Sequence, residues 1–212
     1  MQVRNQLSSQ RHKNTKKMQQ QNIHDYQNGT FQAASGCMVN LVNPTIQQIR
    51  IDDISHALGN LCRFGGHTSP FYSVAQHSCL VAALAPPHLK LAALLHDASE
   101  AYLGDVIKPL KHLLGHTYTA LEDEFMQVIG DKFGIPQMDF AAVLEYDLRA
   151  LELEDEALRQ RKYSTLIYTM ELTGLLRAEG KWAWSSFIAA HHFRDTFFEL
   201  YYTENIPSPV AL

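Results

Sequence analysis

Apolar residues along this chain recur mostly three or four positions apart, a spacing that predicts amphipathic helices rather than strands. A capping box, Ser73-Val-Ala-Gln76, starts one such helix, and Pro86-Pro87 separates it from the next. Together the periodic stretches predict helices at residues 54–62, 74–85, 89–103, 117–133, 140–161, 170–179 and 182–202. A short extended segment at residues 37–42 precedes them. We therefore expect a single all-α domain built as a helical bundle.

The first 34 residues differ from the rest in composition and charge. They are rich in Gln, Asn, Ser and Lys and have almost no apolar periodicity, which predicts a flexible basic arm before a domain at residues 35–212. The arm could contact nucleic acid, or it could be an extension without a role. The domain itself is acidic, which makes nucleic acid an unlikely partner and favours small ligands.

The cysteine spacing and the hydropathy of the chain indicate where in the cell the protein is expected to reside. The three cysteines are widely spaced and form no CxxC pair, so neither a disulfide framework nor a thiolate zinc site is indicated. No apolar run approaches the roughly 18 to 20 residues that span a bilayer. We expect a cytoplasmic protein without a membrane partner. The sequence leaves the oligomeric state open, a homo-oligomer included.

Two neighbouring helices each present a histidine on an apolar face. Nine residues separate His77 from Pro86, and nine separate Pro87 from His96, so an antiparallel pair brings the two imidazoles face to face. Asp97 follows at about 100° around its helix, close enough to converge with His96 on one ion. The alternative for such a pair is a hydrogen-bonded core histidine beside a surface aspartate.

A third helix, predicted at residues 140–161, adds a carboxylate. Asp147 lies between Leu144 and Leu151 on the face expected to be buried, where an unpaired carboxylate is costly and needs a cation. The other acids of this helix are expected to face solvent: Glu145, Glu152, Glu154 and Asp155. Near the carboxyl end, aromatic side chains are expected to pack and His191-His192 to lie at the surface or edge; the aromatic residues are Trp182, Trp184, Phe187, Phe193, Phe197 and Phe198.

Two nitrogen and two oxygen ligands suit a borderline divalent ion such as manganese, cobalt, nickel, zinc or iron. A site with open coordination positions indicates hydrolysis, because such an ion lowers the pKa of bound water and polarises a phosphoryl oxygen. A loop after the first helix carries Arg63, Phe64 and His67 around two glycines, and can wrap a flat anionic ligand. The stem of Arg63 is expected to lie on the surface while its guanidinium reaches a phosphate, so that Arg63 serves the substrate and not the fold.

The order H…HD…D, with His96-Asp-Ala-Ser-Glu100 followed by Gly104-Asp105, resembles the HD-domain metal-dependent phosphohydrolases. Within them the chain is similar to the branch of bacterial 5′-deoxynucleotidases and phage relatives, some of which are dATP triphosphohydrolases. The resemblance covers about residues 50 to 160 and implies an HD-domain helical bundle. It also implies four metal ligands: His77, His96, Asp97 and Asp147.

The same resemblance implies roles for residues around the metal. Glu100 and Asp105 would handle protons, Arg63 and Lys108 would hold phosphate, and Phe64 occupies the place of the family's aromatic residue beside that arginine. The connections from the first histidine to the second, and on to the last aspartate, are shorter than in the bacterial monophosphatases. Both shortened connections lie next to the expected pocket, so the number of phosphates in the accepted substrate stays open.

The sequence therefore predicts a phosphohydrolase of small deoxynucleotides, either a dNMP 5′-nucleotidase or a dNTP triphosphohydrolase of the phage dATP type. The alternative is a catalytically inactive module that contains a metal and senses a nucleotide. Glu100 and Asp105 favour the enzyme, because a sensor needs the metal ligands but neither of these additional acids.

Overall fold

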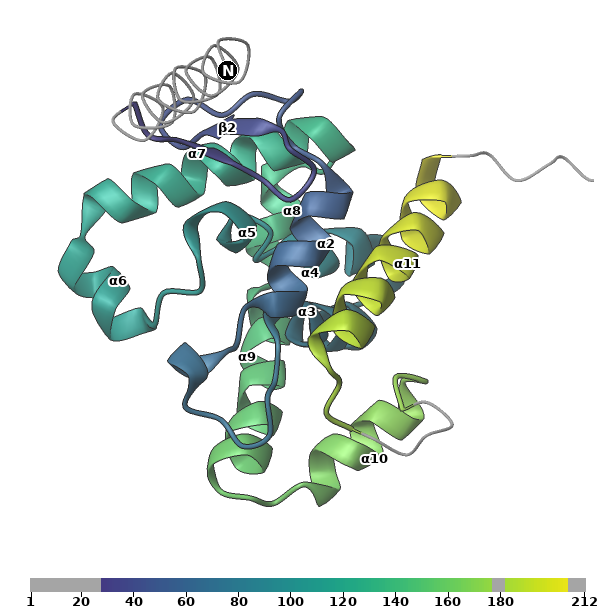
Figure 1. The fold of residues 1–212 in the computed structure, drawn as a ribbon. Coiled ribbons are helices and arrows are strands. Elements are labelled where there is room, and N and C mark those ends of the chain that lie inside the picture. Colours follow the sequence, from purple (N-terminus) through teal and green to yellow (C-terminus); the bar gives the residue numbers. More distant parts are fainter. Residues whose placement is uncertain (1–27, 177–181, 206–212) are drawn as a thin grey trace, which may run out of the picture.

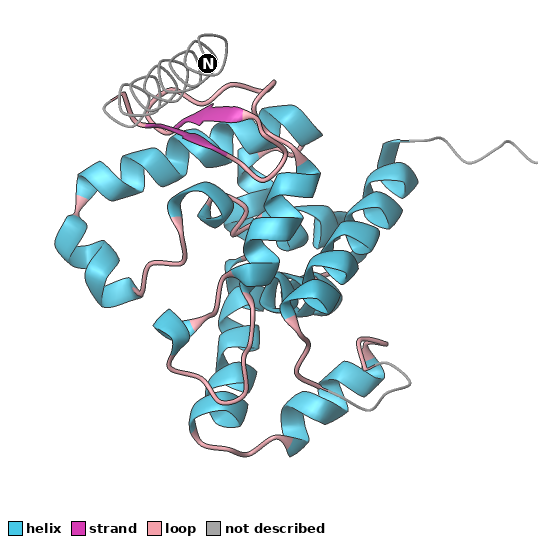
Figure 2. Ribbon diagram, in the orientation of Figure 1, coloured by secondary structure: helices cyan, strands magenta, loops and turns pink. Residues whose placement is uncertain are grey.

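Helices supply nearly all of the regular structure in the computed structural model, which describes residues 28–176 and 182–205 (Figures 1 and 2). The longer helices are α2 (Ile51–Asn60), α3 (Val74–Leu84), α4 (Lys90–Leu95), α6 (Lys108–Leu114), α7 (His116–Phe133), α8 (Gln137–Ala142), α9 (Leu144–Glu154), α10 (Ser164–Leu172) and α11 (Ser186–Asn205). The all-α prediction is confirmed. Among the described helices, none has the length and apolar content needed to cross a membrane.

Helix α3 forms the centre of the core and is buried from Val74 to Ala82. The Ser73 hydroxyl accepts a hydrogen bond from the backbone N–H of Gln76, at 3.1 Å, so Ser73 caps the helix as predicted. The second half of the predicted capping box is absent, because the Gln76 side chain bonds the backbone of Trp182 and Trp184 instead. Helices α2, α4, α9 and α11 surround α3 (Figure 1). A Cβ atom at Gly59 would lie 2.6 Å from the Cβ of Ala190, so the glycine allows α2 and α11 to approach closely.

A two-stranded hairpin precedes the bundle. Strand β1 (Thr30–Gln32) pairs antiparallel with β2 (Met38–Asn40), which lies within the predicted extended segment. The turn is tied to α2, because the Ser35 backbone N–H and hydroxyl donate to the two carboxylate oxygens of Asp53 at 2.6 and 2.7 Å. The structure thus places residues 28–34 of the predicted arm with the domain. Residues 1–27 lie outside the described residues.

The helix predicted at residues 89–103 is interrupted at its functional residues. It begins with a 3-10 turn (Pro87–Leu89), continues as α4 to Leu95, and resumes as the short α5 (Glu100–Leu103). Between them the backbone makes tighter bonds three residues apart, from the Ala98 N–H to the Leu95 carbonyl and from the Glu100 N–H to the Asp97 carbonyl. His96 and Glu100 therefore do not share one continuous α-helical face.

The helix predicted at residues 140–161 is also divided. Helices α8 and α9 meet at Val143, and a π-helical turn (Asp155–Arg159) follows α9. The expected N-cap, Asp139, lies inside the first turn of α8, which Pro136 precedes. The expected stripe is wrong at Leu144 and Leu148, which are 60% and 44% exposed. Leu158, which was also expected in this stripe, is buried, and the other buried positions of the segment are Val143, Ala150, Leu153, Glu154 and Ala157.

Helix α11 covers the other side of the core with aromatic residues. Phe193 and Phe197 are buried as expected, but Phe187 is 78% exposed and lies outside the core, stacked on His191 with ring centroids 6.1 Å apart. His192 is buried and stacks on Trp184 with ring centroids 4.5 Å apart, so the prediction of a surface position holds only for its neighbour His191. The side-chain amide of Gln76 joins this region to α3 by bonding backbone atoms of Trp182 and Trp184.

Candidate metal centre and the adjoining pocket

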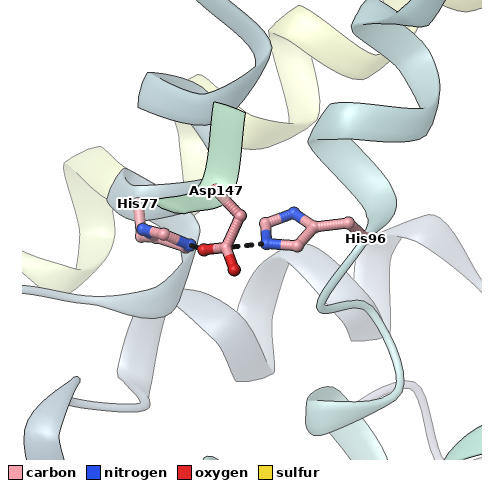
Figure 3. A group of neighbouring side chains, drawn as sticks. All are labelled: His77, His96 and Asp147. Carbon is pink, nitrogen blue, oxygen red and sulfur yellow. Dashed lines mark ion pairs between the residues drawn. The ribbon is translucent and has the colours of Figure 1, made fainter. Parts of the chain in front are cut away.

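Three elements far apart in the sequence bring His77, His96 and Asp147 together (Figure 3). His77 lies in α3, His96 ends α4, and Asp147 lies in α9. Their ligand atoms are all within 4.8 Å of one another. Oδ1 of Asp147 is 3.1 Å from Nε2 of His77 and 3.8 Å from Nε2 of His96. The imidazole centroids are 5.2 Å apart, as the equal connections to the Pro86-Pro87 break predicted.

The fourth predicted ligand, Asp97, borders the same group. Its Oδ2 lies 3.3 Å from Nε2 of His96 and 3.6 Å from Nε2 of His77. Two carboxylates therefore face the same two imidazole nitrogens. This arrangement is repulsive unless a cation, either a proton or a metal ion, lies among the four groups.

The outer nitrogens of both histidines already have hydrogen-bond partners. Nδ1 of His77 is 2.8 Å from Oε1 of Glu154, and Nδ1 of His96 is 2.8 Å from the carbonyl oxygen of Ala93. Each acceptor fixes the proton on Nδ1 and leaves the Nε2 lone pair directed at the cluster. Both Nε2 atoms are buried without a hydrogen-bond partner. Buried, preoriented imidazole nitrogens that face carboxylate oxygens without forming a hydrogen bond fit a site for a metal ion.

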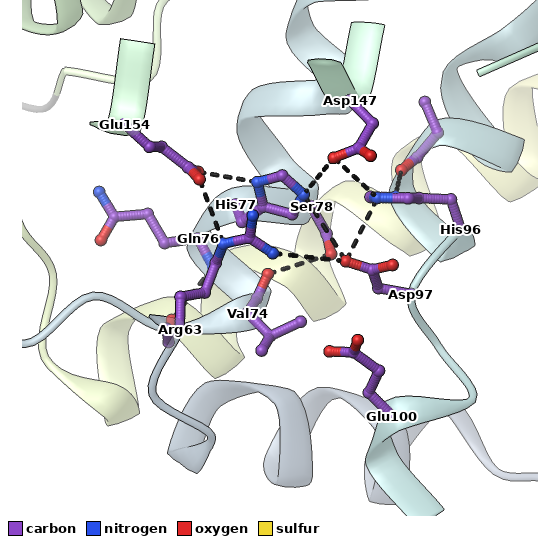
Figure 4. A network of polar contacts seen from close by, with 12 residues as sticks. Arg63, Val74, Gln76, His77, Ser78, His96, Asp97, Glu100, Asp147 and Glu154 are labelled. Atoms are coloured by element: carbon purple, nitrogen blue, oxygen red, sulfur yellow. Dashed lines mark hydrogen bonds and ion pairs between the residues drawn. The ribbon is translucent and has the colours of Figure 1, made fainter. Parts of the chain in front are cut away.

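The position of Glu154 differs most from the sequence-based prediction. It was expected to face solvent, yet its side chain is fully buried between His77 and Arg63 (Figure 4). Burial alone would raise the pKa of Glu154, but Arg63 and His77 outweigh that effect and lower its pKa below the ordinary value. The signal that could have found it is helical phase, since Asp147, Ala150 and Glu154 share one face of α9.

Arg63 differs from its predicted geometry as well. Its side chain was expected to lie along the surface, but it is only 11% exposed. Nε is 3.1 Å from Oε2 of Glu154, and Nη1 is 3.6 Å from Oδ2 of Asp97. Burial opposes its charge, yet these two carboxylates raise the pKa of Arg63 further above its ordinary value. The guanidinium is therefore part of the charged cluster as well as of the pocket wall.

The charges of this cluster balance a divalent cation. Asp97, Asp147 and Glu154 carry three negative charges and Arg63 one positive charge, so neutral imidazoles leave a net charge of −2. Burial disfavours a charged imidazole, but Asp97 and Asp147 outweigh it and raise the pKa of His96 to about 10. The cluster thus attracts positive charge strongly, which a proton supplies when no metal is bound.

A cavity of about 470 Å³ opens beside the cluster. Eight of the ten predicted site residues line it: Arg63, Phe64, His67, Asp97, Glu100, Asp105, Lys108 and Asp147. The other two, His77 and His96, contact Asp97 and Asp147 from the core side. Leu151 and Arg159 also line the cavity and were not singled out from the sequence, because no local motif marks them.

The loop that carries Arg63 and Phe64 is held at both ends. The backbone N–H of Arg63 donates to the carbonyl of Tyr72 at 2.9 Å, and the backbones of Cys62 and Ser73 pair as an isolated antiparallel β-bridge. Between these anchors Phe64 has a positive φ of 56°, a strained conformation for a residue with a side chain. The Arg63 guanidinium lies 5.4 Å from the centroid of the Phe64 ring. The loop therefore presents an aromatic face next to a fixed cation.

Glu100 and Asp105 line the same cavity. Burial, together with the charges of Asp97 and Asp105, raises the pKa of Glu100 well above its ordinary value. Burial also raises the pKa of Asp105. Nζ of Lys111 is 3.4 Å from Oε1 of Glu100, while Oε2 of Glu100 is buried without a partner. Carboxyl groups tuned in this direction can exchange protons nearer neutral pH than ordinary ones.

No protein-family model matches the chain. Part of it is similar to the uncharacterized protein YfdR of Escherichia coli (strain K12), which is 45% identical over 106 residues, covering 50% of this chain and 59% of that protein. The uncharacterized protein RCAP_rcc00048 of Rhodobacter capsulatus is 42% identical over 111 residues, covering 48% of this chain and 57% of that protein. The chain thus spans less than two thirds of the length of these relatives, and their descriptions assign no activity.

Proposed function

We propose that this chain is a metal-dependent phosphohydrolase of small deoxynucleotides. One observation carries the proposal: two buried imidazole nitrogens without hydrogen-bond partners and two carboxylates converge at the wall of a cavity. The same cavity is lined by positively charged side chains and by acids with raised pKa values. The similarity of the HD motif to metal-dependent phosphohydrolases supports the same reading. The two uncharacterized relatives neither support nor oppose it.

The residues of the cluster fit a divalent transition metal. Two imidazole nitrogens with two carboxylates suit manganese, cobalt, nickel, zinc or iron, and the cluster's charge of −2 matches such an ion. When bound, the ion would supply Lewis acidity to a phosphoryl oxygen and lower the pKa of water in the site. His77, His96, Asp97 and Asp147 are the residues that would hold it.

Hydrolysis of a phosphoester forms a bond between a water oxygen and phosphorus and breaks the bond from phosphorus to the leaving oxygen. The water must lose a proton, and the leaving oxygen must gain one. Glu100 and Asp105, with raised pKa values on the open wall of the cavity, are suited to these two transfers. Each transfer contributes roughly 10² to 10⁴ in rate.

The rest of the cavity suits a nucleotide of modest size. Its volume of about 470 Å³ lies within the range of small-ligand pockets. Lys108 and His67 at its rim can bond phosphate oxygens, and Arg63 adds positive charge nearby. Phe64 and Leu151 offer apolar surface to a base or a deoxyribose ring. The sensing module remains the alternative that a direct activity measurement must exclude.

The test is to incubate purified protein with each dNMP and dNTP in the presence of Mn²⁺ or Co²⁺. Separating phosphate, pyrophosphate and triphosphate then identifies the bond that is cleaved. We expect metal-dependent release of one of these products and none after chelation. Nucleotide binding without hydrolysis of any of the substrates would overturn the enzyme proposal and leave the sensing module.

A further inference from the structure

The fully buried carboxylate of Glu154 lies outside the ligand set but contacts it from the core side. It lies seven residues after Asp147, two helical turns along the same face of α9. A buried carboxylate without partners is strongly destabilising, so the fold keeps Glu154 at this position only because other groups compensate its charge. Both of its oxygens are directed at groups of the candidate site (Figure 4).

The first oxygen determines which nitrogen of His77 can bind a metal. Oε1 of Glu154 lies 2.8 Å from Nδ1 of His77. An ionised carboxylate can only accept a hydrogen bond, so Nδ1 must carry the proton. The lone pair then resides on Nε2, which faces Asp147 at 3.1 Å. Glu154 therefore selects the tautomer that directs a free lone pair into the cluster.

The second oxygen holds Arg63. Oε2 of Glu154 is 3.1 Å from Nε of Arg63, whose Nη1 is 3.6 Å from Oδ2 of Asp97. The same Oδ2 is 3.6 Å from Nε2 of His77. Four side chains thus form a closed ring of contacts, and Glu154 closes it (Figure 4). A change in one member shifts the position of the other three.

The second histidine is held in a different way. Nδ1 of His96 lies 2.8 Å from the backbone carbonyl of Ala93, a neutral acceptor that side-chain substitution leaves in place. A charged acceptor makes an imidazole a stronger metal ligand than a neutral one does. Of the two imidazoles in the cluster, His77 alone has a carboxylate on Nδ1.

We propose that Glu154 is a positioning residue of the metal centre. One oxygen fixes the tautomer of His77, and the other holds Arg63 against Asp97 at the edge of the cavity. This inference rests on the proposed function only in taking the His77, His96, Asp97 and Asp147 cluster as a metal site. It assigns part of the metal affinity to a residue that does not touch the metal.

Glu154→Gln tests the proposal with little change in side-chain volume. An amide is neutral and places an NH₂ group where one carboxylate oxygen lay, so it cannot both accept from Nδ1 of His77 and form an ion pair with Arg63. We expect Mn²⁺ affinity, measured by titration calorimetry on metal-stripped protein, to fall about 10- to 100-fold. Glu152→Gln is the matched control, because it removes the same charge from the same helix at an exposed position, where Glu152 forms an ion pair with Arg149 at 3.0 Å.

The control is expected to bind Mn²⁺ within twofold of wild type. A folded Glu154→Gln protein that also binds within twofold would overturn the proposal, as would a Glu152→Gln protein that loses as much affinity as Glu154→Gln. The absorption spectrum of the Co²⁺-loaded proteins gives a second signature. It should change in Glu154→Gln, since the orientation of a ligand changes, and not in Glu152→Gln.

A measurement on wild type keeps the proposal falsifiable if Glu154→Gln does not fold. In zinc-loaded protein, long-range ¹H–¹⁵N NMR spectra of the histidine rings should show the His77 proton on Nδ1. A proton on Nε2 would overturn the proposal. Failure of the proposed function is read separately, from the absence of nucleotide hydrolysis by wild type, because neither the metal titration nor the NMR spectra depend on turnover.

Discussion

The two walls of the candidate site are built differently. The wall formed by α3, the end of α4, and α9 is part of the core, and its polar groups contact one another in a closed network. The opposite wall includes α6, in which no residue is buried, and which packs chiefly on α7 (Figure 1). Lys111 ties this wall to the site, with Nζ 3.4 Å from Glu100 and 2.7 Å from Glu122.

This difference suggests that the packed wall serves to hold a metal ion and the outer wall serves to bind the substrate. Groups that must converge within a few ångströms on one ion lie on packed helices, where their rotamers are restricted. Asp105 and Lys108, which we propose to contact the substrate, lie on a lightly packed segment flanked by Gly104 and Gly115, both with positive φ. Substitutions on the packed wall should therefore affect metal content and stability together. Substitutions on the outer wall should change turnover or substrate affinity at nearly unchanged stability.

The largest expected effect is on the packed wall, at a metal ligand. His96→Ala should lose about one equivalent of bound metal and with it all measurable hydrolysis, because a ligand must matter at least as much as the roughly 10- to 100-fold lost on changing an outer-shell partner. Metal analysis after gel filtration measures this. His191→Ala, at a site 61% exposed, is the control. Equal metal content in the two variants would refute the ligand assignment.

The next effect is at the two acids that line the cavity, Glu100 and Asp105. Glu100→Gln and Asp105→Asn should each keep the metal and lose about a hundredfold in kcat, within the roughly 10²- to 10⁴-fold range of proton transfer. Glu122→Gln also removes a partner of Lys111 but lies outside the cavity, so it should change kcat less than threefold. If both acid variants turn over like Glu122→Gln, neither acid handles protons.

Arg63 and Lys108 compare the two walls directly. Arg63→Ala removes the cation between two buried carboxylates, so it should cost roughly 3 kcal/mol of stability as well as more than tenfold in kcat/KM. The structure thus corrects the expectation, drawn from the loop sequence alone, of an arginine that serves only substrate. Lys108→Ala, on the exposed end of α6, should raise KM a few fold at an unchanged melting temperature. Equal melting temperatures for both variants would contradict the difference between the walls.

The sequence predicted the convergence of the candidate metal ligands because their positions follow from local rules. A capping box, a proline break and equal distances to His77 and His96 determine how two antiparallel helices align. Asp147 was found by helical phase even though the apolar stripe drawn around it was partly wrong. An error at Leu144 and Leu148 did not move Asp147, because α9 still presents its aspartate to α3.

The parts that the sequence did not predict depend on tertiary partners. Glu154 looks like a surface acid in an acid-rich helix until Arg63 and His77 are known to lie beside it. The interruption between Leu95 and Glu100 has no glycine or proline to mark it. His192 is buried because Trp184 stacks on it, a contact that periodicity cannot reveal. For Glu154 and His192 a distant residue, rather than local propensity, decides the outcome.

The smallest expected effect concerns the metal-stripped protein and its dependence on pH. The pKa of His96 is raised to about 10 in the folded protein, above the 6.5 of an unperturbed imidazole. Protonation therefore stabilises the metal-free fold fully below about pH 6.5, and this contribution is lost as the pH rises through 10. One proton corresponds to about 1.4 kcal/mol per pH unit, or about 3 to 6 °C in melting temperature for a domain of this size.

Between pH 7 and pH 9 the melting temperature of chelator-treated wild type should fall more steeply than that of chelator-treated His96→Gln, which lacks the titrating imidazole. Lysines and thiols titrate in both proteins, so the difference between the two slopes isolates His96. With saturating metal the excess slope of wild type should disappear, because the ion replaces the proton among the carboxylates of Asp97 and Asp147. Parallel slopes without metal would mean that no proton is held in the packed wall, and the electrostatic contrast between the two walls would then fail.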